Sequence, residues 1–384
     1  MWSNPPSSPP PLFLWWIDMT KRQLLRRIMA HLDRPLLAGM AMLVAVSLLT
    51  LYSAGEHSMD RVVAQGANIL VALVCMWIVA NLPLHYLMRT AVPIYLVGMV
   101  LLLGVLTPLG VSSHGAKRWL NIGVATIQPS ELMKIGVPLM MAWYFEKHEA
   151  ALRMKNYIVA ALLLLMPVGL IAKQPDLGTA LLISASGFYV LFLAGLSWRV
   201  MVGMLVAAIA SAPVMWKMMH EYQRHRIEML LDPTQDALGK GYHTIQGMIA
   251  VGSGGIFGKG YLNGTQTHLD FLPERTTDFI FAVYSEEFGL VGNLILLAIY
   301  FFVIWRGFVI TANASTYFTR LMAGSITLTF ATYAFVNMGM VSGILPIVGV
   351  PLPLVSYGGT SMLTLLLGFG MLMSIQTHKK LVKT

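Results

Sequence analysis

Long apolar runs recur along most of the chain, and short polar or charged segments separate them. Each run is near the roughly 20 residues that a helix needs to cross a bilayer. This pattern is typical of a multi-pass, all-α integral membrane protein rather than of a soluble fold. It predicts ten transmembrane helices, at 36–53, 62–80, 91–107, 130–145, 156–172, 177–195, 199–217, 278–305, 317–339 and 356–376.

Two of the expected spans are less regular than the others. The span 130–145 is short and carries charge, and the span 278–305 is long enough to be broken at Gly289 or Gly292. No internal repeat is evident, which argues against a transporter built from two related halves.

Composition agrees with this pattern. Of the 384 residues, 57% are hydrophobic and only 11% are charged, whereas soluble domains carry about 25% charged residues. The net charge is +9, but the basic residues lie mainly between apolar runs, where they set topology rather than bind nucleic acid. The single cysteine, Cys75, lies within an apolar run and cannot form an intrachain disulfide, so we expect it to pack as a small side chain.

The distribution of basic residues favours one orientation in the membrane. With the N-terminus inside, most Lys and Arg residues fall in inside segments, as the positive-inside rule requires. The short outside segments then hold only Arg61, Lys117, Arg118 and Lys173. Both termini are therefore expected on the inside, in the cytoplasm.

The same orientation divides the chain into three parts. We expect residues 1–34 to form a partly disordered cytoplasmic tail and residues 378–384 to form a basic cytoplasmic tail. Residues 35–377 form a single membrane domain, in which residues 218–277 are a long outer loop. Long loops are exempt from the positive-inside rule, so this loop needs its own explanation.

The outer loop ends at Asp278, where a polar segment becomes an apolar helix. An aspartate at that place is either a helix cap, whose oxygen accepts a free backbone N–H, or a general base that faces a cleft at the membrane surface. Partial desolvation there would raise its pKa toward a useful range. Glu274 and Arg275 precede it in the same polar segment.

Glu286 and Glu287 follow about two turns later, roughly 12 Å deeper along the same helix. Ionisable groups at such depth are costly and rarely face lipid. At least one of the two is therefore expected to face the bundle interior and pair with a base. A purely structural polar network is the alternative.

A second polar group lies around Glu131 and Lys134. The two residues are three apart, so they share one helical face and can pair within the membrane, as a structural ion pair or in catalysis. Lys117 and Arg118 precede Trp119, which suits an interfacial amphipathic turn or the binding of a substrate phosphate.

A third polar group contains Lys173 and Asp176 and joins two spans in few residues on the outer side. It is either a tight turn with a helix cap at Asp176 or part of a site near Asp278. In the outer loop, Arg224 and Arg226 are interleaved with aromatic and polar residues, and residues 252–260 are rich in glycine.

The glycine-rich stretch fails the P-loop pattern because Lys259 is followed by glycine rather than by serine or threonine. Its backbone amides suit a pyrophosphate or a carbohydrate, and a merely solvated loop is the alternative. Residues 346–353 are rich in proline and cannot form a regular helix. They are also too apolar for a free loop, which predicts a re-entrant or packed segment that is buried in protein or lines a cavity.

These motifs resemble the SEDS family (shape, elongation, division and sporulation) over nearly the whole chain from about Asp33. The resemblance rests on Gly115 to Trp119, Gln128 to Glu131, Gln174 to Thr179, Gly254 to Gly260, Leu272 to Val283, Glu286 to Gly289 and Pro353 to Gly359. Residues 264–275 are more similar to the elongation branch, RodA, than to the division branch, FtsW.

The resemblance implies a ten-helix fold and a peptidoglycan glycosyltransferase that polymerises lipid II for cell elongation and rod shape. It also implies a class B penicillin-binding protein as the transpeptidase partner, together with membrane lipids and other membrane proteins of the elongation complex. No organic cofactor is expected, and a divalent cation (Mg²⁺ or Mn²⁺) is left open because no ligand set is readable.

The resemblance also assigns residues. The family's essential aspartate matches Asp278, and its intramembrane acid–base pair matches Glu131 and Lys134. The family usually has His-Thr-Asp, and this chain has Thr276 where the histidine stands. We take that exchange as tolerated, because the aspartate and its flanks are intact.

These expectations combine into a mechanism on the outer face. Asp278 would act as the general base, and basic residues would stabilise the leaving pyrophosphate. The candidates for that second role are Lys117, Arg118, Lys173 and Arg224. A lipid II flippase is an alternative that an inside-facing polar cluster would favour, but the inside segments are short and simply basic. A scaffold that only recruits the penicillin-binding protein would leave the buried charges without a function.

Overall fold

In the computed structural model, helices dominate the chain and a small sheet is attached to them. The structure describes residues 31–113, 116–121, 126–219, 224, 227–230, 232, 240–265 and 274–378. The tails expected at 1–34 and 378–384 fall mostly outside these residues. The helices are α2 (Arg34–Ala54), α3 (Met59–Ala80), α4 (Leu84–Leu106), α5 (Pro129–His148), α6 (Met154–Ala172), α7 (Leu177–Leu193), α8 (Trp198–Met218), α10 (Lys240–Ser253), α12 (Ile280–Ala312), α13 (Tyr317–Val341) and α14 (Gly359–Thr377).

Helices lie over every expected span, but they do not all qualify as membrane crossings by length and composition. Seven are long and apolar enough, namely α2, α3, α4, α6, α12, α13 and α14. Helix α7 and residues 198–214 of α8 are shorter apolar helices. Helix α5 contains the expected charges, Glu131 and Lys134. The chain is thus a multi-pass membrane protein, and the exact number of crossings stays a prediction.

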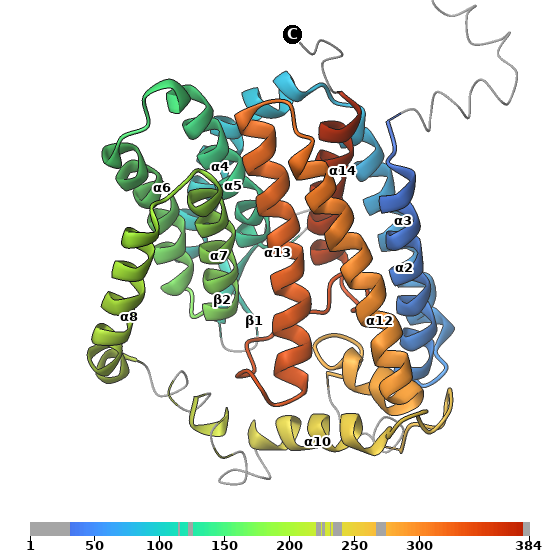
Figure 1. The fold of residues 1–384 in the computed structure, drawn as a ribbon. Helices are drawn as coiled ribbons and strands as arrows, with labels where there is room; N and C mark the ends of the chain where they lie inside the picture. The colour runs from blue at the N-terminus through green and yellow to red at the C-terminus, as the bar shows by residue number, and fades with distance from the viewer. Residues whose placement is uncertain are drawn as a thin grey trace, which may run out of the picture.

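The helices pack into one bundle whose members come from distant parts of the chain (Figure 1). Helix α14 packs against α3, α12 packs against α2 and α13, and α7 packs against α6 and α13. Large apolar side chains also cover the outside of the bundle, such as Leu70, Val100, Leu162 and Phe301. Such a surface suits contact with lipid tails, because it would be unfavourable in water.

The first and last described residues lie at the same end of the bundle. The rings of His31 and His378 stack with their centroids 4.7 Å apart. Helix α10 lies across the opposite end, which we call the loop end (Figure 1). The structure thus agrees with termini on one side of the membrane, while the identity of that side stays a prediction.

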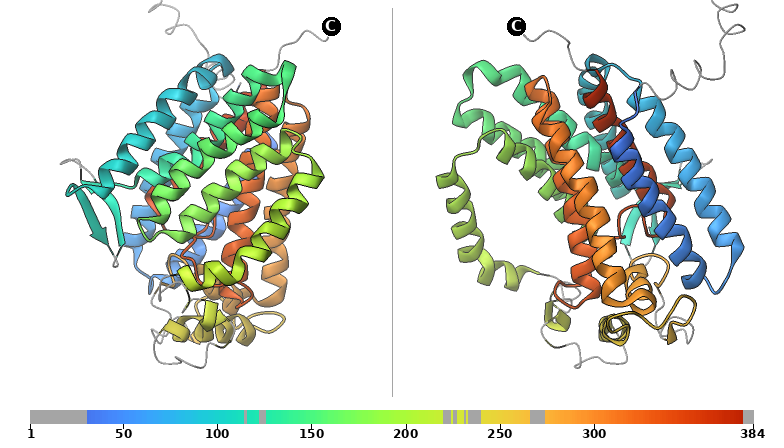
Figure 2. Two further views of the ribbon diagram at one scale, coloured as in Figure 1. Left: turned by 90° about the vertical axis from the view of Figure 1, so that its left-hand side faces the viewer. Right: turned by 45° about the vertical axis from the view of Figure 1, so that its right-hand side comes forward.

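A three-stranded antiparallel sheet lies at the flank of the bundle (Figure 2). Its strands are β1 (Gly110–Ser113), β2 (Ala116–Asn121) and β3 (Thr126–Ile127). Lys117 and Arg118 therefore lie on a strand, and the expectation of an amphipathic turn there was wrong. The segment is too short and too polar for a span, and pairing with β1 and β3 satisfies its backbone hydrogen bonds instead.

Helix α12 is broken at one of the two glycines that the sequence indicated. Gly289 has φ 63° and ψ −160°, which are not helical angles. The break leaves backbone groups unpaired on both sides, and the glycine-rich stretch fills it. The amides of Lys259 and Gly260 donate to the carbonyls of Glu286 and Glu287 at 3.0 and 3.1 Å.

The second half of α12 is completed by the same stretch. The amides of Leu290 and Val291 donate to the carbonyls of Gly255 and Ile256 at 2.9 and 3.0 Å. A Cβ at Gly258 would clash with the carbonyl oxygen of Glu287, so the close approach requires glycine. The stretch 254–260 is thus a plug in a broken helix. The expectations of a phosphate cradle or a merely solvated loop were both wrong for these amides.

Candidate active site

Asp278 lies in a turn, residues 274–279, that leads into α12. The helix begins at Ile280 with Phe279 as its N-cap, so the helix-cap interpretation of Asp278 was wrong. The Asp278 side chain is partly buried, and its Oδ2 would lie 3.4 Å from a Cβ built on Gly349. The carboxylate thus lies against the proline-rich segment.

Three consecutive carbonyls of this turn receive hydrogen bonds from the C-terminal part of the chain. The Tyr357 amide donates to the Thr276 carbonyl at 2.9 Å. The Ser356 hydroxyl donates to the Thr277 carbonyl at 2.6 Å, and the Asn337 amide group donates to the Asp278 carbonyl at 2.8 Å. We call this arrangement the carbonyl clamp, and it fixes the backbone from which the Asp278 carboxylate projects.

The proline-rich segment between α13 and α14 is non-helical, and its C-terminal part is deeply packed. Leu352, Leu354 and Val355 are at most 1% exposed. Side chains of the surrounding helices bind its carbonyls: Tyr300 donates to Pro353 at 2.7 Å, and Ser47 donates to Val355 at 2.7 Å. Irregular backbone is tolerated inside a membrane protein when protein groups satisfy it in this way. Burial in protein, one of the two settings expected for residues 346–353, thus holds for Val350, Leu352 and Pro353, whereas Gly349 is exposed.

The other side of this segment contacts α7 and α13. A Cβ at Gly178 would overlap the carbonyl oxygen of Val348. Val350 is buried in a small cluster with Leu182 and Tyr333. The segment is therefore packed between the Asp278 turn on one side and the start of α7 on the other.

Asp176 at the start of α7 is both a helix cap and an ion-pair partner. Its Oδ1 accepts from the Thr179 amide at 3.3 Å, which confirms the cap interpretation. The same oxygen lies 3.7 Å from Nη1 of Arg118, and Oδ2 accepts from Gln128 at 3.3 Å. The third polar group of the sequence thus joins the second, through Arg118.

The other two basic candidates nearby are Lys117 and Lys173. The Lys117 ammonium donates to the Thr107 carbonyl at 2.6 Å. Lys173 is exposed at the end of α6. The buried Nε of Arg118 has no hydrogen-bond partner among the described residues. A buried donor of this kind is costly unless something binds it, so the Arg118 guanidinium has a donor that the described residues leave unused.

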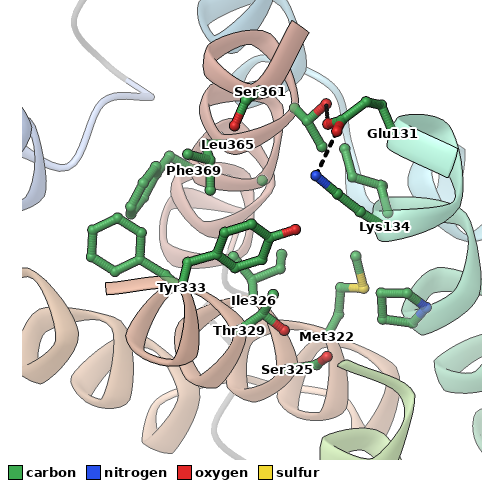
Figure 3. A pocket seen from close by; sticks show the side chains of 15 residues that line it. Glu131, Lys134, Met322, Ser325, Ile326, Thr329, Tyr333, Ser361, Leu365 and Phe369 are labelled. Carbon is green, nitrogen blue, oxygen red and sulfur yellow. Dashed lines mark hydrogen bonds and ion pairs between the residues drawn. The ribbon is translucent and has the colours of Figure 1, made fainter. Parts of the chain in front are cut away.

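Glu131 and Lys134 form the expected pair within α5, with Nζ 2.5 Å from Oε1. They line a cavity of about 50 Å³ between α5, α13 and α14 (Figure 3). The Lys134 ammonium lies 5.2 Å from the centre of the Tyr333 ring, and Thr364 donates to Glu131 Oε2 at 3.1 Å. The pair thus supplies charged groups to a cavity whose lining is otherwise mostly apolar.

Glu286 forms the second buried pair, as expected, but with a base that the sequence did not suggest. Its side chain is fully buried, and Oε1 lies 2.7 Å from the Lys259 ammonium. The amide and hydroxyl of Thr265 also donate to that oxygen, at 2.9 and 3.0 Å. Ser53 donates to the adjacent Glu287. This network closes the break in α12.

Tyr261 connects the same network to α2. Its hydroxyl donates to the Leu49 carbonyl at 3.1 Å. Burial and the nearby Glu287 carboxylate raise the pKa of Tyr261, so the phenol keeps its proton and its role as donor. The plug is therefore attached to α2 as well as to α12.

The two residues at the start of the Asp278 turn have separate roles. Arg275 is buried and pairs with Glu56 in the turn between α2 and α3. Glu274 is exposed and accepts from the Thr277 hydroxyl at 2.7 Å. Both contacts stabilise the Asp278 turn, and neither residue lines the cavity beside Glu131 and Lys134.

Arg224 is directed elsewhere. Its Nε and Nη2 donate to the carbonyls of Trp216 and Lys217 at 2.8 and 2.6 Å, at the end of α8. Arg226 lies outside the described residues. The structure therefore does not bring Arg224 together with Asp278, whereas it does bring Arg118 and Asp176 together.

Sequence reasoning missed Asn337, Ser356, Gly349 and Glu56 as neighbours of the Asp278 turn. One signal was available: Asn337 is an amide within the apolar run 317–339, and such groups rarely face lipid. For metals, the described part of the chain contains no group of three His, Cys, Asp or Glu side chains suited to an ion. A divalent cation stays an untested expectation.

Comparison with known proteins gives matches over nearly the whole chain. The model of a family of cell cycle proteins (FtsW, RodA and SpoVE) matches residues 23–381. The peptidoglycan glycosyltransferase MrdB of Escherichia coli K12 is 49% identical over 353 residues, which cover 92% of this chain and 95% of that protein. The protein of the same name from Helicobacter pylori is 35% identical and covers 90% of each chain.

Two solved structures share the fold. One is a chain from a study of the structural coordination of polymerization and crosslinking by a peptidoglycan synthase complex. It has a TM-score of 0.78 and 31% identity, over 90% of this chain and 97% of that one. The Rod shape determining protein RodA of Thermus thermophilus has a TM-score of 0.67 and 29% identity, over 90% and 96%. The likeness thus holds in both sequence and fold.

Proposed function

The chain belongs to the FtsW, RodA and SpoVE family of cell cycle proteins, and on that premise we propose that it is a peptidoglycan glycosyltransferase of the RodA type. It polymerises lipid II into glycan strands during cell elongation. The observation that carries this proposal is a partly buried carboxylate, Asp278, on a backbone that three hydrogen bonds fix. A partly buried carboxylate on a fixed backbone suits a general base, since its position relative to a bound hydroxyl is set in advance.

The reaction requires one proton transfer and one displacement. The 4-hydroxyl of the acceptor GlcNAc attacks C1 of the donor MurNAc, and Asp278 takes the hydroxyl proton. A C–O glycosidic bond forms as the bond between C1 and the pyrophosphate oxygen breaks. Polyprenyl pyrophosphate leaves with the electron pair, and nearby cations stabilise its charge.

Arg118, Lys117 and Lys173 are the cations proposed for that second role. Arg118 is the strongest of them, because Asp176 orients its guanidinium while its buried Nε has no partner among the described residues. An arginine fork suits a phosphate well. Arg224 is less suited, since its nitrogens bind the carbonyls at the end of α8. A divalent cation delivered with the pyrophosphate would add to the same stabilisation.

The proposed membrane topology is the one expected from the sequence. Ten helices cross the bacterial inner membrane, both termini lie in the cytoplasm, and the Asp278 turn faces outward. Stacking of His31 on His378 at one end, with α10 across the other, supports this arrangement. We further propose a class B penicillin-binding protein as the partner, since a structural relative comes from a study of coupled polymerization and crosslinking.

The test is glycan polymerisation from purified lipid II, with the protein co-purified with its penicillin-binding protein and moenomycin added to silence other polymerases. Asp278→Asn keeps the shape of the side chain and removes the base, so polymer should disappear from the gel. Asp60→Asn is the matched control, because Asp60 is an exposed carboxylate in the first turn of α3. It should polymerise like the wild type.

Polymer at the wild-type rate from folded Asp278→Asn would remove Asp278 from the role of base. If the folded, partnered wild-type protein makes no polymer, the glycosyltransferase proposal is wrong. A flippase or a scaffold would then be the remaining explanation, and Thr276 the first position to examine.

A further inference from the structure

Asn337 occupies an unusual place in α13. Its side chain is fully buried, and its single amide nitrogen donates two hydrogen bonds. One goes to the Asp278 carbonyl at 2.8 Å and the other to the Val350 carbonyl at 2.7 Å. Both N–H groups are therefore used, and each is used on a different segment of the candidate site.

The two carbonyls fix which end of the amide is nitrogen. An oxygen in that position would lie within 2.8 Å of two other oxygens, which is repulsive. The amide oxygen Oδ1 is buried and has no hydrogen-bond partner among the described residues. The site thus requires a double donor at this position and makes no use of an acceptor.

The two segments that Asn337 joins are the turn that carries the Asp278 carboxylate, the proposed base, and the proline-rich segment that this carboxylate contacts. Asp278 carries the carboxylate, and Gly349, next to Val350, is the residue against which Oδ2 lies. One side chain therefore sets the spacing between the carboxylate and the wall it faces. Ser356 adds a second link of the same kind, donating to the Thr277 carbonyl at 2.6 Å and accepting from the Leu352 amide at 2.7 Å.

We infer that Asn337 is a positioning residue for the transferase reaction, acting through the Asp278 backbone and the proline-rich segment to hold the base at its working distance. This inference rests on the proposed role of Asp278. Asn337 does not contact substrate in this account, because its side chain is fully buried. Its contribution is to the rate of the chemical step rather than to lipid II affinity.

Asn337→Asp is the decisive variant, since it keeps the shape of the side chain and replaces the donating nitrogen by oxygen. We expect kcat for polymerisation to fall by about 10- to 100-fold, because displacing a catalytic group by about 1 Å can cost that much. KM for lipid II should stay within about twofold of the wild-type value, as expected when only transition-state positioning is lost.

Two further variants separate positioning from general damage. Asn156→Asp is the matched control, because Asn156 is a buried helical asparagine in α6 whose Oδ1 accepts from the Arg153 amide. It should leave kcat unchanged. Ser356→Ala removes the second link and leaves the hydrogen bonds that the Tyr357 amide and Asn337 make to the Asp278 turn. It should therefore lower kcat less than Asn337→Asp does. Melting curves in detergent give the folded fraction of each variant at the assay temperature, and each polymerisation rate is divided by that fraction.

The outcomes are distinct. If Asn337→Asp lowers the melting temperature but the folded fraction keeps the wild-type kcat, the inference is overturned and Asn337 is only structural. A large rise in KM with kcat unchanged would also overturn it. If Asp278→Asn is inactive while both clamp variants match the wild type, the proposed function stands without this inference. If Asp278→Asn is active, the proposed function itself fails.

Discussion

The interior of this protein contains two acid–base pairs that look alike in composition and differ in setting. Glu131 and Lys134 are neighbours on one helix and line a cavity beside Tyr333. Glu286 and Lys259 are 27 residues apart and meet where α12 is broken. In the second pair, the amide and hydroxyl of Thr265 also donate to the glutamate oxygen.

The difference teaches that a buried charge pair is not by itself a sign of catalysis. The pair at the break is enclosed by the plug that completes α12, so it holds two segments together. The pair on α5 faces open space between three helices, where a further group can reach it (Figure 3). Burial makes both pairs costly to break, but of the two only the α5 pair, Glu131 and Lys134, lines the cavity between α5, α13 and α14.

The largest expected effect comes from forcing the plug out of the break. Gly258→Ala places a Cβ against the Glu287 carbonyl at a residue with φ +79°, so we expect stability to fall by about 3 kcal/mol or more. Gly255→Ala is the matched control, since it has φ +57° and nothing within 4 Å of an added Cβ. It should cost only about 1 kcal/mol. Equal losses in thermal melting would mean that the plug does not depend on close approach.

The same substitution at the two lysines compares the pairs directly. Lys259→Met leaves the fully buried Glu286 charge without its base, so we expect stability to fall by about 3 kcal/mol. Turnover per folded molecule should be retained. Lys134→Met should also lower stability, but its main effect should be loss of polymerisation.

A double variant sharpens that result. Glu131→Gln with Lys134→Met removes both charges and should recover stability relative to Lys134→Met alone, because no unpaired charge is left. Polymerisation should stay lost. If turnover returns together with stability, the α5 pair is structural, and the contrast between the two pairs disappears. Melting curves and lipid II gels on the same preparations measure both quantities.

The smallest effects are expected at the two threonines that support the glutamates. Thr364→Val removes one hydrogen bond to Glu131, and Thr265→Val removes the hydroxyl that donates to Glu286 and accepts from Lys259. We expect stability to fall by about 1 kcal/mol in Thr364→Val and by about 1 to 2 kcal/mol in Thr265→Val, since one such bond is usually worth about 1 kcal/mol. Only Thr364→Val should slow polymerisation. If folded Thr265→Val polymerises lipid II more slowly than the wild type, the plug contributes to catalysis as well as to stability.

Local features were predictable where the cause is local. Spacing of three along a helix predicts the Glu131–Lys134 pair, because residues at that spacing share a face. A break at Gly289 or Gly292 was indicated, since a long apolar helix has a weak point at a glycine, and the structure has it at Gly289. The cap at Asp176 follows from its place before an apolar run. None of these needs knowledge of a distant segment.

Features that join distant segments were not predictable. The partner of Glu286 is a lysine in a stretch that resembles a solvated loop, and its role depends on unpaired backbone groups inside α12. The short sheet was missed because its strands are too brief to give a clear alternation. Asp278 was expected as either a cap or a base, and only the position of Phe279 as N-cap removed the first alternative.

The sequence alone determined that this chain lies in a membrane, which segments are apolar enough to be helical, and which charged residues stand out from that background. Those properties depend on transfer free energies and on spacing along one helix, which are local quantities. Only the tertiary structure decided which charges face a cavity and which close a break. It also decided that Asn337, Ser356 and Tyr357 hold the Asp278 turn. The reason is physical: a buried backbone carbonyl must find a donor, and which donor it finds depends on how distant helices pack.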